Sequence, residues 1–217
     1  EFMGKFLEKD HFVIAISGTH GKSTTTAMIA LMLEDAGLDP TAELGAIVPK
    51  WGKNYRVGKD KIFITEADEF NDNFLATIPD IAVVTNIEMD HPEYFKDFTA
   101  VKDSFHKFLL KTKNTIVANI SDPGVSDVLK VLMKETGVQC LDYSKNKLNL
   151  ELKVPGEFNV LNASAAFQVG LLLGITPEKI IKSLNNYAGI SRRFERIGKI
   201  KGADTYSDFG HHPTKIK

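Results

Sequence analysis

Short apolar runs alternate along this chain with segments in which apolar residues recur at helical spacing. The runs are rich in β-branched residues and predict strands buried on both faces over residues 12–16, 62–65, 81–85 and 115–118. The helical spacing predicts helices over residues 23–36, 100–110, 126–135, 159–173 and 177–187. Strands that alternate with helices indicate βαβ units. We therefore expect an α/β fold with a mostly parallel sheet flanked by helices.

The last part of the chain departs from this alternation. Residues 196–207 form short alternating runs around Gly198 and Gly202, so we expect one α/β domain followed by a tail. The chain does not begin with Met, and it stops just after an apparent motif. We expect a piece of a longer protein.

The composition excludes several classes of protein. With 217 residues, 43% of them hydrophobic, and a net charge of −1, the chain is neither disordered nor charged enough to suggest a nucleic-acid or anionic-lipid partner. No apolar stretch approaches the roughly 20 residues that a membrane-spanning helix needs. A single cysteine, Cys140, excludes an internal disulfide and indicates a reducing compartment, so we expect a cytoplasmic protein.

Residues 18–23, Gly-Thr-His-Gly-Lys-Ser, lie between the first predicted strand and the first predicted helix. This is the context of a phosphate-binding loop, in which backbone N–H groups and the positive helix end face one anion. Lys22 would then reach the β- and γ-phosphates of ATP, and the Ser23 hydroxyl would ligate Mg²⁺. The loop is a short variant, because Ile16 stands where the usual spacing has a glycine. The alternative is a glycine-rich turn with an exposed lysine.

Two further polar groups follow predicted strands. Residues 66–69, Glu-Ala-Asp-Glu, and residues 88–91, Glu-Met-Asp-His, come after the second and third strands. Ligands of parallel sheets gather at the carboxyl ends of strands, so both groups could face the phosphate loop. The carboxylate of Glu66 suits Mg²⁺. His91 is less usual as a magnesium ligand, and a structural or surface role for it stays open.

Taken together, these segments resemble the central domain of the Mur ligases, the ATP-dependent amide ligases of peptidoglycan synthesis. The blocks that carry the resemblance are residues 18–26, 66–69, 85–91, 156–163, 192–195 and 208–214. They occur in the family's order along most of the chain. The resemblance implies a P-loop-type α/β domain that binds ATP and Mg²⁺.

The resemblance also implies roles for individual residues. ATP-binding roles fall on Gly18, Thr19, His20, Gly21, Lys22, Ser23 and Thr24, with Asn159 and Asn162 near the adenine. Catalytic roles fall on Lys22, Glu66, His91, Arg193 and Asp208. Ser23 and Glu66 would hold one Mg²⁺, and Glu66 and His91 a second one. Arg193 would reach the phosphates or the hinge, and Asp208 would help to register a closing C-terminal domain.

Within the family, the histidine of the loop and the Asp-x-Gly-His-His-Pro block at residues 208–213 are most similar to members that add L-alanine to UDP-N-acetylmuramate through an acyl phosphate. Members that recycle murein peptide are the alternative. Later-acting members carry a carbamylated lysine where this chain has Phe105, which favours the alanine adders. Phe158 departs from their pattern, which has histidine at that position.

The resemblance divides the chain into a central ATP-binding domain, residues 1–190, and a hinge with the beginning of a C-terminal domain, residues 191–217. It implies that an N-terminal UDP-sugar domain and most of the C-terminal domain are absent. The oligomeric state stays open.

Other functions stay open beside this interpretation. An unrelated P-loop kinase or ATPase would need only the loop and one acidic group, but it leaves the asparagine block and the block at residues 208–213 unexplained. A non-catalytic nucleotide-binding module is a second alternative. A Mur-like amidotransferase subunit is a third, although its relatives carry four zinc-binding cysteines and this chain has only Cys140.

Overall fold

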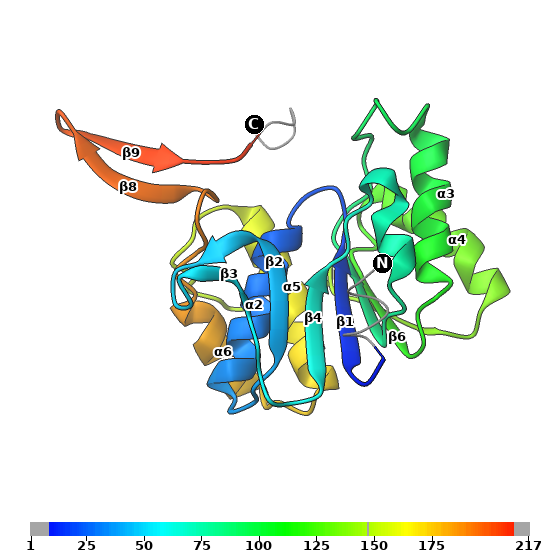
Figure 1. Ribbon diagram of the computed structural model, residues 1–217, viewed down its shortest axis with the longest axis horizontal. Helices are drawn as coiled ribbons and strands as arrows, with labels where there is room; N and C mark the ends of the chain where they lie inside the picture. The colour runs from blue at the N-terminus through cyan, green and yellow to red at the C-terminus, as the bar shows by residue number, and fades with distance from the viewer. Residues whose placement is uncertain (1–8, 147, 211–217) are drawn as a thin grey trace.

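A computed structural model describes residues 9–146 and 148–210 of the chain. Its centre is a seven-stranded sheet in the order β3-β2-β4-β1-β5-β6-β7 (Figure 1). The strands are β1 (Phe12–Ser17), β2 (Thr41–Val48), β3 (Lys53–Arg56), β4 (Ile62–Glu66), β5 (Ile81–Val84), β6 (Thr115–Ala118) and β7 (Gln139–Asp142). Neighbouring strands are parallel except β2 and β3, which form an antiparallel hairpin at one edge. The mostly parallel sheet expected from the sequence is confirmed.

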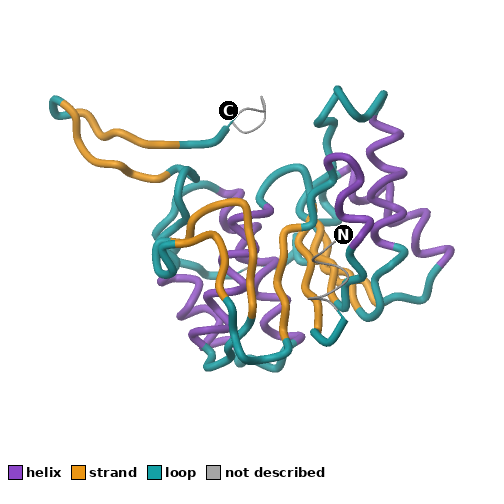
Figure 2. Tube along the Cα trace, viewed as in Figure 1, coloured by secondary structure: helices purple, strands orange, loops and turns teal. Residues whose placement is uncertain are grey.

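Helices cover both faces of the sheet (Figures 1 and 2). The helices are α2 (Lys22–Asp35), α3 (Phe98–Leu109), α4 (Pro123–Glu135), α5 (Glu157–Leu172) and α6 (Pro177–Asn186), with a short 3₁₀ segment η1 (Phe70–Ala76). One face packs against α2, α5 and α6, and the other against α3, α4 and η1. The layers follow from the parallel strands, whose crossover connections place helices on both faces. Among the described residues, we find no helix that could span a lipid bilayer.

Alternate side chains of β1 point to opposite faces of the sheet and belong to two separate hydrophobic cores. Ile14 and Ile16 are fully buried in the core beneath α2, while Ala15 belongs to the core beneath α3 and α4. Each buried Ile stabilises the fold by about 1.5–3 kcal/mol. Phe105 of α3 is also fully buried, with its ring centroid 5.2 Å from that of Phe74. At this position the chain therefore contributes to a hydrophobic core.

The predicted helices and strands are all present, with ends shifted by no more than about three residues, the usual uncertainty of helix boundaries. The largest shift is at the start of α4, which was predicted at residue 126 and lies at Pro123. Asp122 caps this helix, because its side chain accepts a hydrogen bond from the backbone N–H of Val125. Strands β2, β3 and β7 and the segment η1 were not predicted from the sequence.

The end of the described chain lies outside the main sheet. Strands β8 (Glu195–Ile200) and β9 (Ala203–Ser207) form a separate antiparallel hairpin. Figure 1 shows it, in orange and red, projecting away from the layered body. Its residues Ile197 and Ile200 are 66% and 63% exposed. The hairpin therefore carries apolar side chains that the described part of the chain leaves uncovered.

Candidate nucleotide and metal site

The predicted phosphate loop, residues 18–23, connects β1 to α2 in a conformation that requires glycine. Gly18 and Gly21 have φ angles of 132° and 85°. A Cβ added to Gly18 would overlap the Thr85 hydroxyl oxygen, and one added to Gly21 would lie 2.6 Å from Asn162 Oδ1. The two glycines thus let the loop pack closely between the end of β5 and α5.

A segment that follows β5 braces this loop. The side chain of Asn86 accepts a hydrogen bond from the backbone N–H of His20 at 2.8 Å and donates one to the carbonyl of the same residue at 3.1 Å. The Asn86 carbonyl accepts a third bond from Thr19 N at 3.1 Å. Two loop N–H groups are therefore already used. An anion would be received by the first N–H groups of α2, which have no acceptor within a helix.

Glu88 adds a second contact between the same segment and the loop. Its backbone N–H donates to Thr19 Oγ1 at 2.9 Å, and its carboxylate lies 3.3 Å from His20 Nε2. The sequence suggested that this group could face the phosphate loop. The structure shows that Glu88 also contacts the loop directly, through Thr19 and His20.

Lys22 lies in an acidic, largely buried environment. Its ammonium donates to the carbonyl of Gly18 and to Glu69 Oε2, both at 2.7 Å, and lies 3.4 Å from Asp68 Oδ1. Burial by itself lowers the pKa of Lys22, but the carboxylates of Glu69 and Asp68 outweigh it and hold the pKa above its usual value. Burial raises the pKa of Glu69, and Lys22 opposes that rise. Lys22 is therefore charged at neutral pH.

Ser23 and Glu66 face the same small space beside Gly45. Glu66 Oε1 accepts a hydrogen bond from Gly45 N at 2.8 Å. A Cβ at Gly45 would lie 3.3 Å from Glu66 Oε2 and 3.7 Å from Ser23 Oγ. Arg193 donates to Ser23 Oγ at 3.2 Å. A hydroxyl, a carboxylate and the absence of a side chain at Gly45 fit a hard cation such as Mg²⁺.

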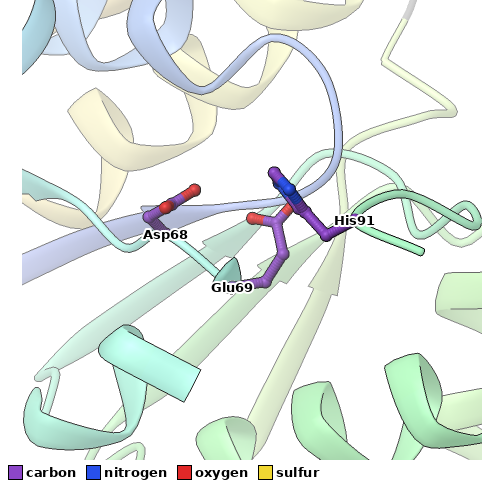
Figure 3. A group of neighbouring side chains, drawn as sticks. All are labelled: Asp68, Glu69 and His91. Atoms are coloured by element: carbon purple, nitrogen blue, oxygen red, sulfur yellow. The ribbon is translucent and has the colours of Figure 1, made fainter. Parts of the chain in front are cut away.

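His91 lies with Asp68 and Glu69, as Figure 3 shows. Each of the three side chains offers an atom suited to bind a metal, and these atoms lie within 4.8 Å of one another. His91 has a φ of 55°, and its Nδ1 is 3.3 Å from a carboxylate oxygen of Glu93. The resemblance pairs His91 with Glu66, and the structure brings His91 together with Asp68 and Glu69, which follow Glu66 in the chain.

The two predicted asparagines lie in the first turns of α5, and Asn162 lies beside the phosphate loop. Asn159 and Asn162 are both 6% exposed. Asn159 Nδ2 donates to the carbonyl of Pro155 at 2.6 Å, and Asn162 Nδ2 lies 3.4 Å from Asn159 Oδ1. Asn162 also lies beside Gly21. Phe158, next to them in the chain, is 61% exposed.

Arg193 and Asp208 lie at the base of the β8–β9 hairpin. Asp208 Oδ2 accepts a hydrogen bond from the backbone of Phe194 at 2.7 Å, and the Arg193 guanidinium lies 5.5 Å from the ring centroid of Phe209. Arg193 thus connects the hairpin to the start of α2, while Asp208 holds the two hairpin ends together. The rest of the predicted block, within residues 211–217, lies outside the described residues.

Several residues of this region were not given a role from the sequence. Glu43 lies on β2, opposite Thr65 of β4, whose hydroxyl donates to it at 3.2 Å. Burial, and to a lesser extent the charge of Glu66, raise the pKa of Glu43. Asn86 and Glu88 brace the loop, as described above. The position of Asn86 and Glu88 directly after a buried strand was the available signal, whereas β2 itself was missed.

Several known proteins are similar to this chain in sequence. A family model described as the Mur ligase middle domain matches residues 16–151. The UDP-N-acetylmuramate–L-alanine ligase of Caldicellulosiruptor saccharolyticus is 39% identical over 243 aligned residues, which cover 100% of this chain and 53% of the relative. The chain thus spans about half the length of the curated relatives it matches.

Solved structures give the same result. The UDP-N-acetylmuramate–alanine ligase of Thermotoga maritima matches with a TM-score of 0.82 and 27% identity, covering 99% of this chain and 54% of that one. A murein peptide ligase from Psychrobacter arcticus matches with a TM-score of 0.78 over 99% of this chain and 55% of that one. At 23% identity, this second match shows the fold alone. The matching family model and the similarity along the whole chain show that this protein belongs to the Mur ligase family.

Proposed function

We propose that this chain is the ATP- and Mg²⁺-binding part of an ATP-dependent ligase that joins L-alanine to UDP-N-acetylmuramate. The observation that carries the proposal is the convergence at the start of α2. There the Lys22 ammonium, the Ser23 hydroxyl and the Glu66 carboxylate lie around a glycine loop. The names of the relatives, which are UDP-N-acetylmuramate–L-alanine ligases, supply the substrates of the proposal.

The loop offers what a nucleoside triphosphate needs. The N–H groups at the start of α2 would receive the phosphates, and Lys22 would neutralise charge on the β- and γ-phosphates. Asn159 and Asn162 are proposed to contact the adenine from α5, since Asn162 lies beside Gly21 of the loop and is hydrogen-bonded to Asn159. Ser23 and Glu66 would hold Mg²⁺, which neutralises phosphate charge.

The proposed reaction proceeds through an acyl phosphate. A carboxylate oxygen of the sugar substrate attacks the γ-phosphorus of ATP, and ADP leaves. The amine of alanine then attacks the acyl carbon, and phosphate leaves as the amide forms. The chain contributes positioning and charge neutralisation, with Lys22 and Arg193 near the transferred group. As the family resemblance implies, His91 would hold a second Mg²⁺ together with Glu66, near the transferred phosphoryl group.

The domain division is part of this proposal. Residues 1–190 would form the central ATP-binding domain, and residues 191–217 the hinge and the beginning of a C-terminal domain. The exposed side chains of Ile197 and Ile200 support it, because they would be covered by the remainder of such a domain. Asp208 would then fix the hairpin from which that domain continues. We place the protein in the cytoplasm, in keeping with its single cysteine.

The reaction is tested with the longer protein to which we propose this chain belongs. Sustained ADP release over many turnovers should require both UDP-N-acetylmuramate and L-alanine. Lys22→Ala should lower kcat/KM by more than about a hundredfold, since the loss of a transition-state charge contact costs at least about 3 kcal/mol. Retention of more than a few per cent of kcat/KM would contradict the role of Lys22. A preference for L-alanyl-γ-D-glutamyl-diaminopimelate over L-alanine would assign the chain to murein-peptide ligation instead.

A further inference from the structure

A buried tyrosine lies between α6 and the phosphate loop without a hydrogen bond from its hydroxyl. Tyr187 directly follows α6, is 4% exposed and belongs to the hydrophobic core shared with α2. Its hydroxyl oxygen is buried and has no hydrogen-bond partner among the residues that the structure describes. A phenylalanine would fill the same space without burying a polar atom, and an unpartnered buried hydroxyl destabilises a fold. The hydroxyl therefore calls for a functional explanation.

The polar groups beside this hydroxyl belong to the proposed nucleotide site. Burial raises the pKa of Tyr187, while the Thr24 side chain and the positive charge of Arg193 oppose the rise, so both lie near the phenol oxygen. Thr24 is in the first turn of α2 and is 9% exposed. Arg193 donates to Ser23 Oγ, in the same turn, at 3.2 Å. Tyr187 thus lies next to the turn that would receive the phosphates.

Arg193 needs a second acceptor if Mg²⁺ binds at Ser23. The Ser23 hydroxyl oxygen, proposed above as a magnesium ligand, already accepts a hydrogen bond from the Arg193 guanidinium. A divalent cation on this oxygen would repel the guanidinium. An arginine side chain can only donate, whereas a tyrosine hydroxyl both accepts and donates. The unpartnered Tyr187 oxygen can therefore take the place of Ser23 as the acceptor.

The backbone around Arg193 is held by other contacts and is left-handed on both sides. Arg192 and Phe194 have φ angles of 60° and 50°. The Arg192 N–H donates to Glu195 Oε2 at 2.8 Å, and the Phe194 N–H donates to Asp208 Oδ2 at 2.7 Å. Non-glycine residues in this conformation are strained, and they persist where the surrounding structure imposes them. The guanidinium is thus presented from a defined backbone beside both acceptors.

We propose that Tyr187 is a positioning residue for nucleotide binding. With ATP and Mg²⁺ bound, the Tyr187 oxygen accepts a hydrogen bond from Arg193, and its O–H donates to Thr24 Oγ1. The Thr24 hydroxyl has a single proton, which is then directed away from Tyr187 and toward the phosphates. This inference rests on the proposed function and adds to it a side chain that acts through two others.

The test is a calorimetric titration of the 217-residue chain with a non-hydrolysable ATP analogue in Mg²⁺, in Tyr187→Phe, Thr24→Val and the double variant. Tyr187→Phe should weaken binding about tenfold, whereas its Tm should stay equal or rise, because the folded chain loses only an unpartnered hydroxyl. The two substitutions should be non-additive by at least about threefold, since the two hydroxyls act together. Without Mg²⁺ the loss in Tyr187→Phe should be smaller, because Ser23 then keeps Arg193.

The matched control is Tyr143→Phe, because Tyr143 is 1% exposed and directly follows β7, away from α6. Its affinity for the nucleotide should equal that of the unmodified chain. Equal affinity in Tyr187→Phe, or an equal loss in Tyr143→Phe, would overturn the inference and leave the proposed function intact. Additive effects of Tyr187→Phe and Thr24→Val that do not depend on Mg²⁺ would also overturn it. No binding to the unmodified chain would contradict the proposed function, and the inference with it.

Discussion

Asn86→Ala should destabilise the phosphate loop although Asn86 lies outside it. The substitution removes the acceptor of the His20 N–H, at 2.8 Å, and one donor to the His20 carbonyl. The carbonyl keeps a hydrogen bond from the Thr85 hydroxyl at 2.5 Å, so the main loss is the stranded N–H. A partly buried donor without an acceptor costs about 1–3 kcal/mol. We expect the free energy of unfolding to fall by that amount.

Urea denaturation followed by circular dichroism measures this change, and thermal melting should show a fall in Tm of roughly 2–4 °C for each kcal/mol. The matched control is Asn149→Ala, because Asn149 is exposed in the loop before α5. ATP affinity should fall in Asn86→Ala and stay unchanged in Asn149→Ala. If the two variants unfold within about 0.5 kcal/mol of each other, the Asn86 side chain is not a brace of the loop.

Three further perturbations follow from the same contacts. Gly21→Ala should weaken ATP binding and lower stability by about 1–3 kcal/mol, because its Cβ would meet Asn162 at 2.6 Å and its φ is 85°; calorimetry and urea denaturation measure the two effects. Asp122→Ala should lower the free energy of unfolding, measured by urea denaturation, by about 2 kcal/mol, because Asp122 caps α4 and accepts a hydrogen bond from Ile87 N at 3.1 Å. A loss of less than about 0.5 kcal/mol would contradict this role. The pKa of Lys22 is raised above its usual 10.5, so its ion pair stabilises the fold fully below pH 10.5 and is lost as pH rises through the folded-state pKa. Tm should therefore fall more steeply above pH 10.5 in the unmodified chain than in Lys22→Met, and parallel pH profiles would refute this.

The elements that the sequence predicts correctly are those with strong apolar signals. Residues 12–16 and 81–85 are almost wholly apolar and β-branched, and both became central strands. By contrast, β2 (Thr41–Val48) lies near the sheet edge, and Glu43 and Gly45 interrupt its apolar pattern. Strand β3 is polar and mostly exposed, and β7, at the opposite edge, is only partly buried and begins and ends with a polar residue, Gln139 and Asp142. The apolar signal is weak where a strand is polar or only partly buried at the edge of a sheet.

The candidate site also contains residues that could be predicted from the sequence and residues that could not. The glycine loop and Lys22 could be identified from the sequence. A glycine-lysine-serine turn between a strand and a helix is a local pattern, and its backbone N–H groups and lysine are suited to bind phosphate. The grouping of His91 with Glu69 could not be predicted, because it depends on how two loops meet over β1. Asn86 was visible as part of a motif, but its hydrogen bonds to His20 follow from the tertiary arrangement.

The most direct test of the central claim is a calorimetric titration of this chain with a non-hydrolysable ATP analogue. It is performed with and without Mg²⁺, beside Lys22→Ala. The account predicts binding that Mg²⁺ strengthens and that Lys22→Ala abolishes, since Lys22 and the Ser23–Glu66 pair face the loop from two sides. Binding that is equal in Lys22→Ala, or absent from the unmodified chain up to millimolar nucleotide, would contradict it.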